Sequence, residues 1–411
     1  MIIEQKVNTS SLYKIIFICF ICTDILYMYG WGDRNINYYS ALILGLFALF
    51  ASVKCGRPTS ILPKILWFLI FDMALVEMIS RHTLPLETLQ VSLPYIAVWG
   101  FVKSKNVGVY LDIYKNIGIV LTLYFYIQFA VYETTGIHLT NQIIGLPICD
   151  SFNSTEYYIN FRQGTRCSSL FSEPSYLCRF LLPLIAVELF RDEKINYKLV
   201  CFFAVPIFLT VSGTGLIALM VLVVFWYISN FQSNKSKTVF KIIIIPVIIL
   251  VFTYALLATE IGEKILLRTD ELSWNYQVGA SKSGYIRMWL GFEVFNEYPW
   301  MNKIFGDMNI QSYVARLLNT EFGYATDDSL LQFSGSGASV LLLRQGFLGL
   351  ILMISLFKNI WKNASLTAKA IMFTFIAYML TEFVYPGFRF AIYMILPYCL
   401  NKQTAINLKL K

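Results

Sequence analysis

The sequence predicts an all-α polytopic membrane protein with about 12 transmembrane helices. Hydrophobic residues make up 57% of the 411-residue chain and charged residues only 14%. An ordinary soluble domain has roughly 25% charged residues. Apolar runs recur along the chain at lengths close to the ~20 residues that a helix needs to cross a bilayer. This composition excludes a soluble globular enzyme, a disordered chain and a disulfide-rich secreted module.

The predicted spans are twelve apolar segments, and lipid requires each of them to be helical because it offers the backbone no hydrogen-bond partner. The last segment is short and the seventh and eighth are nearly continuous, so the count lies between ten and twelve. The segments are residues 14–30, 37–53, 61–79, 88–102, 114–132, 174–190, 197–211, 213–230, 240–258, 336–357, 366–384 and 387–400.

Lysine and arginine residues set the expected orientation. Of the 33 basic residues, 20 lie in the seven short segments 1–14, 52–64, 103–115, 191–198, 231–241, 358–369 and 401–411. All seven fall on one side of a twelve-span chain, and cytoplasmic loops carry the excess of positive charge. Both termini are therefore expected in the cytoplasm. The first span contains Asp24 and lacks a small-residue cleavage site, which indicates an uncleaved anchor.

Two long polar segments lie on the outer side and divide the chain. The expected organisation is five N-terminal helices in 1–132, a first outer loop at 133–173, four helices in 174–258, a second outer loop at 259–335, and three helices with a cytoplasmic tail in 336–411. Long loops in a protein of short connections are usually functional or disordered. The second outer loop is rich in aromatic residues, so we expect it to fold against the membrane surface.

Several kinds of chemistry lack their motifs. The chain has two histidines and no HExxH sequence, and no P-loop lysine follows the Gly279 to Gly284 pair. A zinc hydrolase and ATP-driven transport by this chain alone are therefore unsupported, and we expect neither a metal nor another cofactor. Cys149 and Cys167 both lie in the first outer loop, where they either form a bridge or stay reduced.

Arginines stand beside carboxylates in both outer loops. The first loop holds Arg162, Arg166 and Glu173, and the second holds Arg268, Arg287, Asp327 and Asp328. The planar guanidinium fork is a preferred partner of phosphate, and a carboxylate is a common general base. The pattern fits an enzyme that acts on a lipid diphosphate. The alternative is a set of solvated loop charges.

Charged residues inside spans are costly and usually have a purpose. Glu173 precedes Pro174, which suits the first position of a helix, so Glu173 is expected at the helix cap in a structural or a catalytic role. Arg179, Arg344 and Glu382 lie in the outer halves of their spans. Either Arg344 pairs with Glu382 across neighbouring helices, or Arg179 and Arg344 extend the cationic site into the membrane. Asp24, Asp72 and Glu77 are candidates for contacts between helices and are assigned no function.

Short motifs in a fixed order resemble those of the Wzy-type O-antigen and capsular polysaccharide polymerases, which belong to the O-antigen polymerase and ligase superfamily. The similar stretches are Arg162 to Arg166, Phe171 to Ser175, Thr210 to Gly215, Ser283 to Trp289 followed by Pro299 and Ile304 to Gly306, and Asp327 to Gln332 followed by Gly346 to Gly349. The layout of about 12 helices with two large periplasmic loops is also similar. The predicted arrangement of helices and loops is similar over the whole chain, whereas the similar sequence motifs cover only a few dozen residues.

The departures from the family pattern favour a polymerase over a ligase. An arginine followed eleven residues later by glycine occurs at Arg268 and Gly279 in the second loop, but neither arginine of the first loop has that spacing. Ligases of this superfamily carry a histidine late in the second loop. Here that loop has no histidine, and Asp327 and Asp328 occupy the corresponding region.

The resemblance implies a GT-C-like, metal-independent glycosyltransferase of the bacterial inner membrane. It would join undecaprenyl-diphosphate-linked repeat units into long-chain polysaccharide at the periplasmic face, with a chain-length regulator as a partner and no nucleic acid. The diphosphate would be bound by Arg162, Arg166, Arg268, Arg287, Arg179 and Arg344, and the base would be Glu173, Asp327 or Asp328. The alternatives are an O-antigen ligase that transfers glycan to lipid A-core and a flippase for lipid-linked oligosaccharides.

Overall fold

The computed structural model describes nine segments of the chain and seven single residues. The segments are 21–32, 34–36, 64–89, 91–92, 107–149, 167–190, 195–231, 286–310 and 335–382, and the single residues are Ile18, Ile43, Leu46, Tyr393, Leu396, Pro397 and Leu400. This described part of the chain is mostly helical, as expected. Its strands are the short antiparallel pair β1 (Gly30–Trp31) and β2 (Arg34–Asn35), which follow the 3-10 turn η1 (Ile25–Met28).

Seven helices coincide with seven of the predicted spans. They are α3 (Lys64–Arg81), α5 (Val107–Thr135), α8 (Pro174–Leu189), α9 (Tyr197–Leu209), α10 (Gly213–Phe231), α17 (Gly337–Asn363) and α18 (Leu366–Thr381). By length and apolar composition, α5 and α17 are candidates to cross a membrane, whereas α9, α18 and the 213–229 stretch of α10 are shorter apolar helices. The first predicted span, 14–30, is described at Ile18 and over 21–30, where it ends in the 3-10 turn η1 and the first residue of β1 rather than in the expected helix. The other four predicted spans lie wholly or mainly outside the described residues, so the total number of spans stays a prediction.

Local sequence explains where these helices begin. Asn196, Ser336 and Ser365 each use their side chain to accept a hydrogen bond from a backbone N–H in the first turn of α9, α17 and α18. Such caps satisfy donors that a helix cannot satisfy within itself. Pro174 occupies the first position of α8, where its missing N–H costs nothing.

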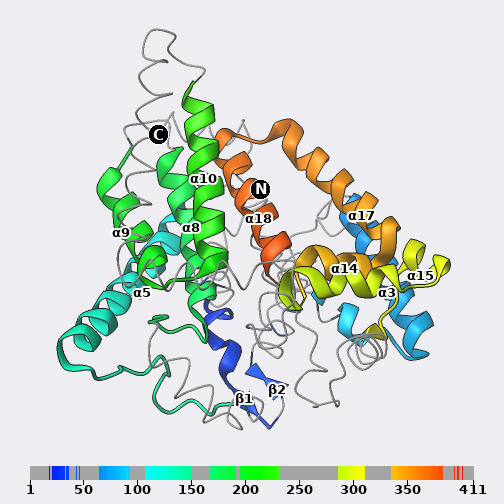
Figure 1. The fold of residues 1–411 in the computed structure, drawn as a ribbon, viewed down its shortest axis with the longest axis horizontal. Coiled ribbons are helices and arrows are strands. Elements are labelled where there is room, and N and C mark those ends of the chain that lie inside the picture. Colours follow the sequence, from blue (N-terminus) through cyan, green and yellow to red (C-terminus); the bar gives the residue numbers. More distant parts are fainter. Residues whose placement is uncertain are drawn as a thin grey trace, which may run out of the picture.

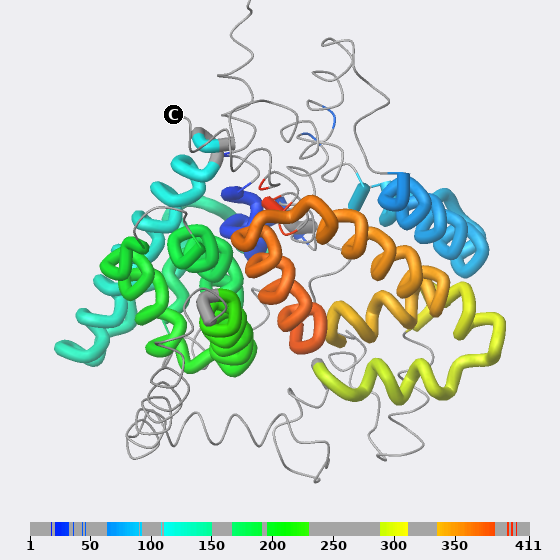
Figure 2. Tube along the Cα trace, turned by 90° about the horizontal axis from the view of Figure 1, so that it is seen from above, coloured from blue at the N-terminus to red at the C-terminus, as the bar shows by residue number. Residues whose placement is uncertain are grey.

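The helices form two groups with α18 between them (Figure 1). Helices α5, α8, α9 and α10 pack on one side, and α3 and α17 lie on the other with the two short helices α14 (Gly291–Asn296) and α15 (Trp300–Phe305). The same grouping is visible in the perpendicular view (Figure 2). Helix α8 is at the centre of the first group, with Leu177, Leu181 and Ile185 fully buried.

Tyrosine hydroxyls connect the helices of the first group. Tyr114 of α5 donates to the carbonyl of Phe180 in α8 at 2.6 Å, and Tyr126 donates to that of Phe202 in α9 at 3.0 Å. A buried phenol needs a hydrogen-bond partner. Because these two bonds run from one helix to the backbone of another, they fix the helices in register.

Helix α17 is broken at Gly346, where φ is 60° and ψ is −158°. Such a break frees backbone groups, which is tolerated in a membrane only where other protein groups satisfy them. The segment after α15 does this, since the N–H of Asp307 donates to the carbonyl of Leu343 at 2.7 Å. Part of the second outer loop is therefore folded against α17, whereas the expectation that this loop lies on the membrane surface stays a prediction.

Two glycines make this contact between α15 and α17 close enough to form. A Cβ built on Gly306 would lie 2.3 Å from the carbonyl carbon and oxygen of Arg344, and one built on Gly346 would lie 2.4 Å from the carbonyl oxygen of Ile304. Both glycines also have a positive φ, which side chains disfavour. Two stretches that resembled family motifs, 304–306 and 346–349, thus meet in space.

The first outer loop pairs with the last residues of the first predicted span and with the residues just after it. Tyr29 forms an isolated antiparallel bridge with Ile148, and the Cys149 N–H donates to the Met28 carbonyl at 3.1 Å. The Cys149 thiol donates to the Gly32 carbonyl at 2.9 Å. Cys149 and Cys167 are both free, so the bridge that the sequence left open is not formed. Burial raises the pKa of Cys167 to about 11, with a smaller contribution from Glu133, which leaves this thiol protonated.

We predict that Gly306→Ala unfolds the contact between α15 and α17. The new methyl group would meet backbone rather than a flexible side chain, and strain at a positive φ alone costs about 1–3 kcal/mol. The unfolding free energy in detergent should therefore fall by at least about 2 kcal/mol. The matched control is Gly213→Ala, because a Cβ there meets nothing within 4 Å. Equal stability of the two variants would contradict this account of the kink.

Candidate functional site

Several helix ends that are far apart in sequence converge at one place. The N–H of Gly337, at the start of α17, donates to the carbonyl of Glu382 at the end of α18 (2.8 Å). The hydroxyl of Ser175, at the start of α8, donates to the Glu382 carboxylate at 2.9 Å. Glu382 therefore connects the first turns of two helices to the last turn of a third.

Arg179 lies at the centre of this junction. Its side chain is 2% exposed, and its guanidinium is 3.5 Å from both the Asp24 and the Glu382 carboxylates. The ring of Tyr176 lies 4.5 Å from the guanidinium carbon. A buried cation requires such partners, because an unpaired charge inside a protein is very costly. One guanidinium thus faces two carboxylates and one aromatic face.

Glu173 is positioned beside this cluster. It is the N-cap residue of α8, as the sequence predicted, but its side chain makes no capping hydrogen bond. It is half-buried, and the Ser175 hydroxyl lies 3.4 Å from its Oε2. The single hydroxyl of Ser175 therefore stands between the carboxylates of Glu173 and Glu382. Three carboxylates thus lie at this junction, and Glu173 is the most accessible of them.

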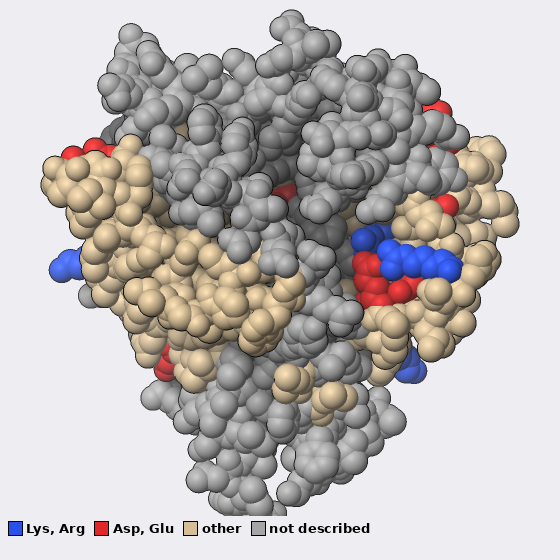
Figure 3. Space-filling model, turned by 90° about the horizontal axis from the view of Figure 1, so that it is seen from below, with Lys and Arg blue, Asp and Glu red and all other residues tan. Residues whose placement is uncertain are grey.

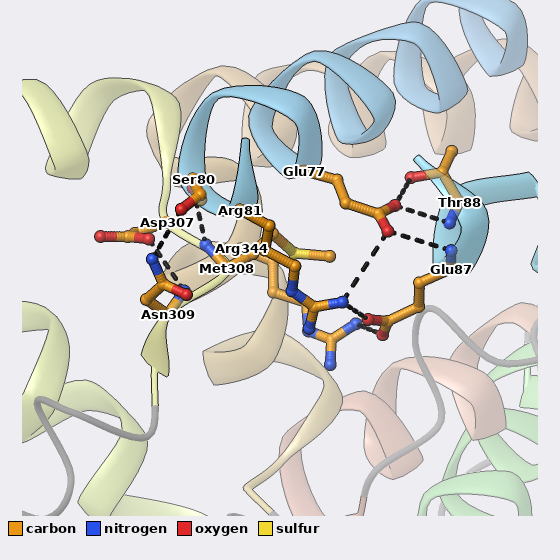
Figure 4. A network of polar contacts seen from close by, with 9 residues as sticks. All are labelled: Glu77, Ser80, Arg81, Glu87, Thr88, Asp307, Met308, Asn309 and Arg344. Carbon is orange, nitrogen blue, oxygen red and sulfur yellow. Dashed lines mark hydrogen bonds and ion pairs between the residues drawn. The ribbon is translucent and has the colours of Figure 1, made fainter. Parts of the chain in front are cut away.

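A second polar cluster joins the end of α3 to the kink of α17 (Figure 4). Glu77 is buried and accepts hydrogen bonds from the N–H groups of Glu87 and Thr88 and from the Thr88 hydroxyl, at 2.7–3.0 Å. Arg81 lies 3.8 Å from Glu77 and 2.9 Å from Glu87. This part of the cluster fixes the short segment after α3 against the end of the helix.

Arg344 completes the second cluster from α17. It donates to the Glu87 carboxylate, so two guanidinium groups from different helices share one acid. Burial by itself would raise the pKa of Glu87, but the charges of Arg344 and Arg81 and their hydrogen bonds outweigh it and lower that pKa below 4.5. Glu87 is consequently ionised at neutral pH.

The neighbouring residues hold this cluster in place. The Gln345 amide donates to the Asp72 carboxylate at 2.9 Å and to the Leu69 carbonyl at 3.0 Å. The Asn309 amide donates to the Ser80 carbonyl at 2.8 Å, and the Met308 N–H donates to the Ser80 hydroxyl at 3.1 Å. On the face seen in Figure 3, basic side chains lie directly against acidic ones on the side of the molecule where α3 and α17 meet.

The structure describes part of the predicted site. Glu173, Arg179 and Arg344 lie in the two clusters, and Arg287 lies in the single π-helical turn η3 (Ile286–Leu290), where only its backbone is described. Arg162, Arg166, Arg268, Asp327 and Asp328 lie outside the described residues. Within the described part of the chain, no group of His, Cys, Asp and Glu side chains is arranged to hold a metal ion.

Of the two alternatives for Arg344, the pairing with Glu382 is not formed, and the three acids that were assigned no function make structural contacts. Arg344 pairs with Glu87 rather than with Glu382, which pairs with Arg179. Asp24 is the second partner of Arg179, whereas Asp72 accepts from Gln345 and Glu77 faces Arg81. Position was the available signal for most of these residues, because Asp24, Glu77, Arg179 and Arg344 lie in the outer halves of their predicted spans and Arg81 and Glu87 lie in the short outer connection between two spans. Asp72 lies in the interior of its span and had no such signal.

We predict that Arg179→Met strongly destabilises the protein, because it leaves Asp24 and Glu382 as buried charges without their cation. Breaking a buried ion pair costs about 3–5 kcal/mol. Lys115→Met is the matched control, since Lys115 pairs with the exposed Asp112 at 3.5 Å and surface pairs contribute under about 1 kcal/mol. Unfolding free energies in detergent provide the measurement, and comparable losses in the two variants would count against a buried triad.

The lowered pKa of Glu87 predicts how stability depends on pH. A carboxyl whose pKa is depressed by folding stabilises the protein above its unfolded pKa, and this contribution is lost as the pH falls through the lower folded value. As the pH falls from neutral into the acidic range, the wild-type protein should therefore lose more stability than Glu87→Gln. Parallel pH profiles of the unfolding free energy would show that Glu87 is not held by the two arginines.

Comparison with known proteins gives one match. Residues 91–280 match the family model described as WcaD colanic acid polymerase, and this range is just under half of the 411-residue chain. It includes the first outer loop, Glu173, Arg179, helices α8 to α10 and Arg268. No curated protein matches the chain. The match, together with the apolar helices, indicates a membrane protein of polysaccharide biosynthesis with glycosyltransferase-like polymerase activity. Over residues 91–280 the chain is thus similar to the WcaD colanic acid polymerase family, consistent with its resemblance to Wzy-type polymerases.

Proposed function

We propose that this protein is a polymerase of the O-antigen type that joins undecaprenyl-diphosphate-linked repeat units at the periplasmic face of the bacterial inner membrane. The observation that carries the proposal is the polymerase family match over residues 91–280. That range contains Glu173 and four of the six arginines assigned to the diphosphate, namely Arg162, Arg166, Arg179 and Arg268. A lipid-linked saccharide is the substrate class that such a family implies.

The reaction is the transfer of a growing glycan from one lipid diphosphate to the terminal sugar of another unit. The acceptor hydroxyl oxygen forms a bond to the anomeric carbon of the donor, and the bond from that carbon to the diphosphate oxygen breaks. The acceptor proton passes to a carboxylate, and the electron pair leaves with the diphosphate. Guanidinium groups stabilise the charge that develops on this leaving group, so the step proceeds without a metal.

Glu173 is our proposed base among the three predicted carboxylates. It is half-buried at the start of α8, and the Ser175 hydroxyl beside it donates to Glu382. The first turn of a helix also favours a negative charge, because its free N–H groups point toward it. Asp327 and Asp328 remain the alternatives within the second outer loop.

The predicted arginines differ in how available they are to a diphosphate. Arg179 already faces two carboxylates and is buried, so its proposed part is to hold the junction around Glu173. Arg344 is 18% exposed and pairs with a single acid, which makes it the better placed of the two to contact substrate. Arg162, Arg166, Arg268 and Arg287 are proposed to complete the site from the two outer loops.

Helix polarity supports placing the proposed site on the outer side. Lys64, Lys198 and Lys369 lie in the first turns of α3, α9 and α18, and Lys358 and Lys362 lie in the last turns of α17. Arg81 lies at the end of α3 opposite Lys64, and Glu382 follows the end of α18 opposite Lys369. Glu173 caps the start of α8 beside Glu382. Because lysine-rich ends face the cytoplasm, the two polar clusters are proposed to face the periplasm.

The proposal predicts that Arg166→Ala, Arg287→Ala and Glu173→Gln each reduce long-chain polysaccharide to single repeat units while the protein stays in the membrane. Loss of one group that stabilises transition-state charge lowers a rate by about 100-fold or more. Lys362→Ala, at the inner end of α17, removes a charge without affecting the site. Chain-length profiles on gels provide the measurement, and normal lengths in the three variants would refute the assignment.

A deletion strain separates the proposal from its rivals. Loss of a polymerase leaves one repeat unit attached to the lipid A-core, whereas loss of a ligase leaves none. A flippase would instead trap lipid-linked units on the cytoplasmic side. Purified protein that lengthens lipid-linked glycans without an energy source would support polymerase activity and exclude transport as the sole function.

A further inference from the structure

The second polar cluster has an unusual composition for a simple ion pair. Arg81 from α3 contacts one oxygen of the Glu87 carboxylate at 2.9 Å, and Arg344 from α17 contacts the other oxygen. Two guanidinium groups that converge on the two oxygens of one anion form the arrangement with which proteins bind phosphate groups. Here an acid of the chain itself occupies the position of the anion (Figure 4).

We propose that Arg81 and Arg344 form a binding site for the diphosphate of a lipid-linked saccharide, and that Glu87 holds this site until the substrate displaces it. The inference rests on the proposed function and deepens it, because it adds Arg81 to the substrate-binding residues and assigns Glu87 a regulatory role. Neither residue belongs to the outer loops that supplied most of the predicted cations.

The site is open enough for exchange. The side chains of Arg81, Glu87 and Arg344 are 39%, 27% and 18% exposed. The Nε of Arg344 is buried and has no hydrogen-bond partner. An unmet donor of a buried cation is costly. A diphosphate has more acceptor oxygens than a carboxylate, so it can satisfy the two guanidinium groups and this remaining donor together.

Glu87 can leave the arginines without unfolding its own segment. Its backbone N–H is bound to Glu77, and the next residue, Thr88, is bound to Glu77 by both its N–H and its hydroxyl. The backbone is thus anchored by Glu77, whereas the Glu87 side chain is held by the arginines. When the Glu87 side chain has turned away, the charges that remain are those of Arg81, Arg344 and Glu77, and Glu77 lies 3.8 Å from Arg81. The site then has a net positive charge.

Both arginines stand on fixed elements, as a preorganised site requires. Arg344 is two residues before the Gly346 break, and its carbonyl lies against Gly306. The adjacent Gln345 is bound to α3 through Asp72 and Leu69. Arg81 is the last residue of α3, and its neighbour Ser80 binds the segment after α15.

The test measures binding of undecaprenyl diphosphate to the full-length protein in nanodiscs without a second substrate. Glu87→Gln should bind this lipid about tenfold more tightly, because the competing charge is gone, and Arg81→Ala should bind it at least about tenfold more weakly. Glu297→Gln, at the C-cap of α14, and Lys303→Ala, in α15, make the same charge changes on residues that make no ion pair with Arg81, Glu87 or Arg344, and should bind as the wild-type protein does.

A merely structural ion pair gives the opposite result for Glu87→Gln, since loss of structure weakens binding. Unchanged or weaker binding by this variant would overturn the proposal. If Arg81→Ala does not fold, the Glu87→Gln result alone decides, because the glutamine keeps the size of the side chain. Inorganic pyrophosphate and phosphatidylglycerol serve as competitors. Equal competition by phosphatidylglycerol would assign the site to a phospholipid headgroup and overturn the assignment to a lipid diphosphate.

The proposed function and this inference fail in different experiments. If the two variants shift binding in opposite directions but the purified protein extends no glycan, the polymerase proposal fails and the diphosphate site stands. If the protein extends lipid-linked glycans and both variants bind undecaprenyl diphosphate as the wild-type protein does, the inference fails and the polymerase proposal stands.

Discussion

The burial of Arg179 between Asp24 and Glu382 is the constraint on which the described architecture depends. A guanidinium that is 2% exposed inside an apolar helix bundle has to be neutralised where it stands. Asp24 comes from the first predicted span and Glu382 from the end of α18. Glu382 also accepts hydrogen bonds from Ser175 in the first turn of α8 and from Gly337 at the start of α17. The contacts around Arg179 therefore fix four segments of the chain and place Glu173 at their common end.

Much of this fold follows from composition and local signals, whereas the pairing of charges does not. Apolar segment length predicted α17 and α18, and Pro174 predicted where α8 begins. The sequence does not say which acid faces which arginine, because Arg344 has several candidates at similar depth. Packing decides it, since the kink at Gly346 turns the outer part of α17 toward α3 and therefore toward Glu87 rather than Glu382.

The sequence showed which glycine-containing stretches resemble family motifs, but it did not show what structural purpose the glycines have. The stretches 304–306 and 346–349 stood out by resemblance alone, and nothing in either one indicates that the two would touch. Their contact is a close approach of two backbones, which requires a missing Cβ on both sides. Arg287 shows a second limit of prediction from sequence. It lies in a π-helical turn, and no periodicity in the surrounding sequence predicts such a turn.

Helix α17 connects the two polar clusters and sets their spacing. It begins beside Glu382, and Arg344 follows seven residues after Gly337, which corresponds to about 10 Å along a helix axis. That length is comparable with a diphosphate and its first sugar. If the diphosphate lies on Arg81 and Arg344 and Glu173 is the base, the proposed reaction requires the sugar bond to be broken to lie between them, along the outer half of α17. A rigid half-helix that ends in a glycine break would then hold the leaving group and the base at a fixed separation, which is what a transfer between two lipid-anchored substrates requires.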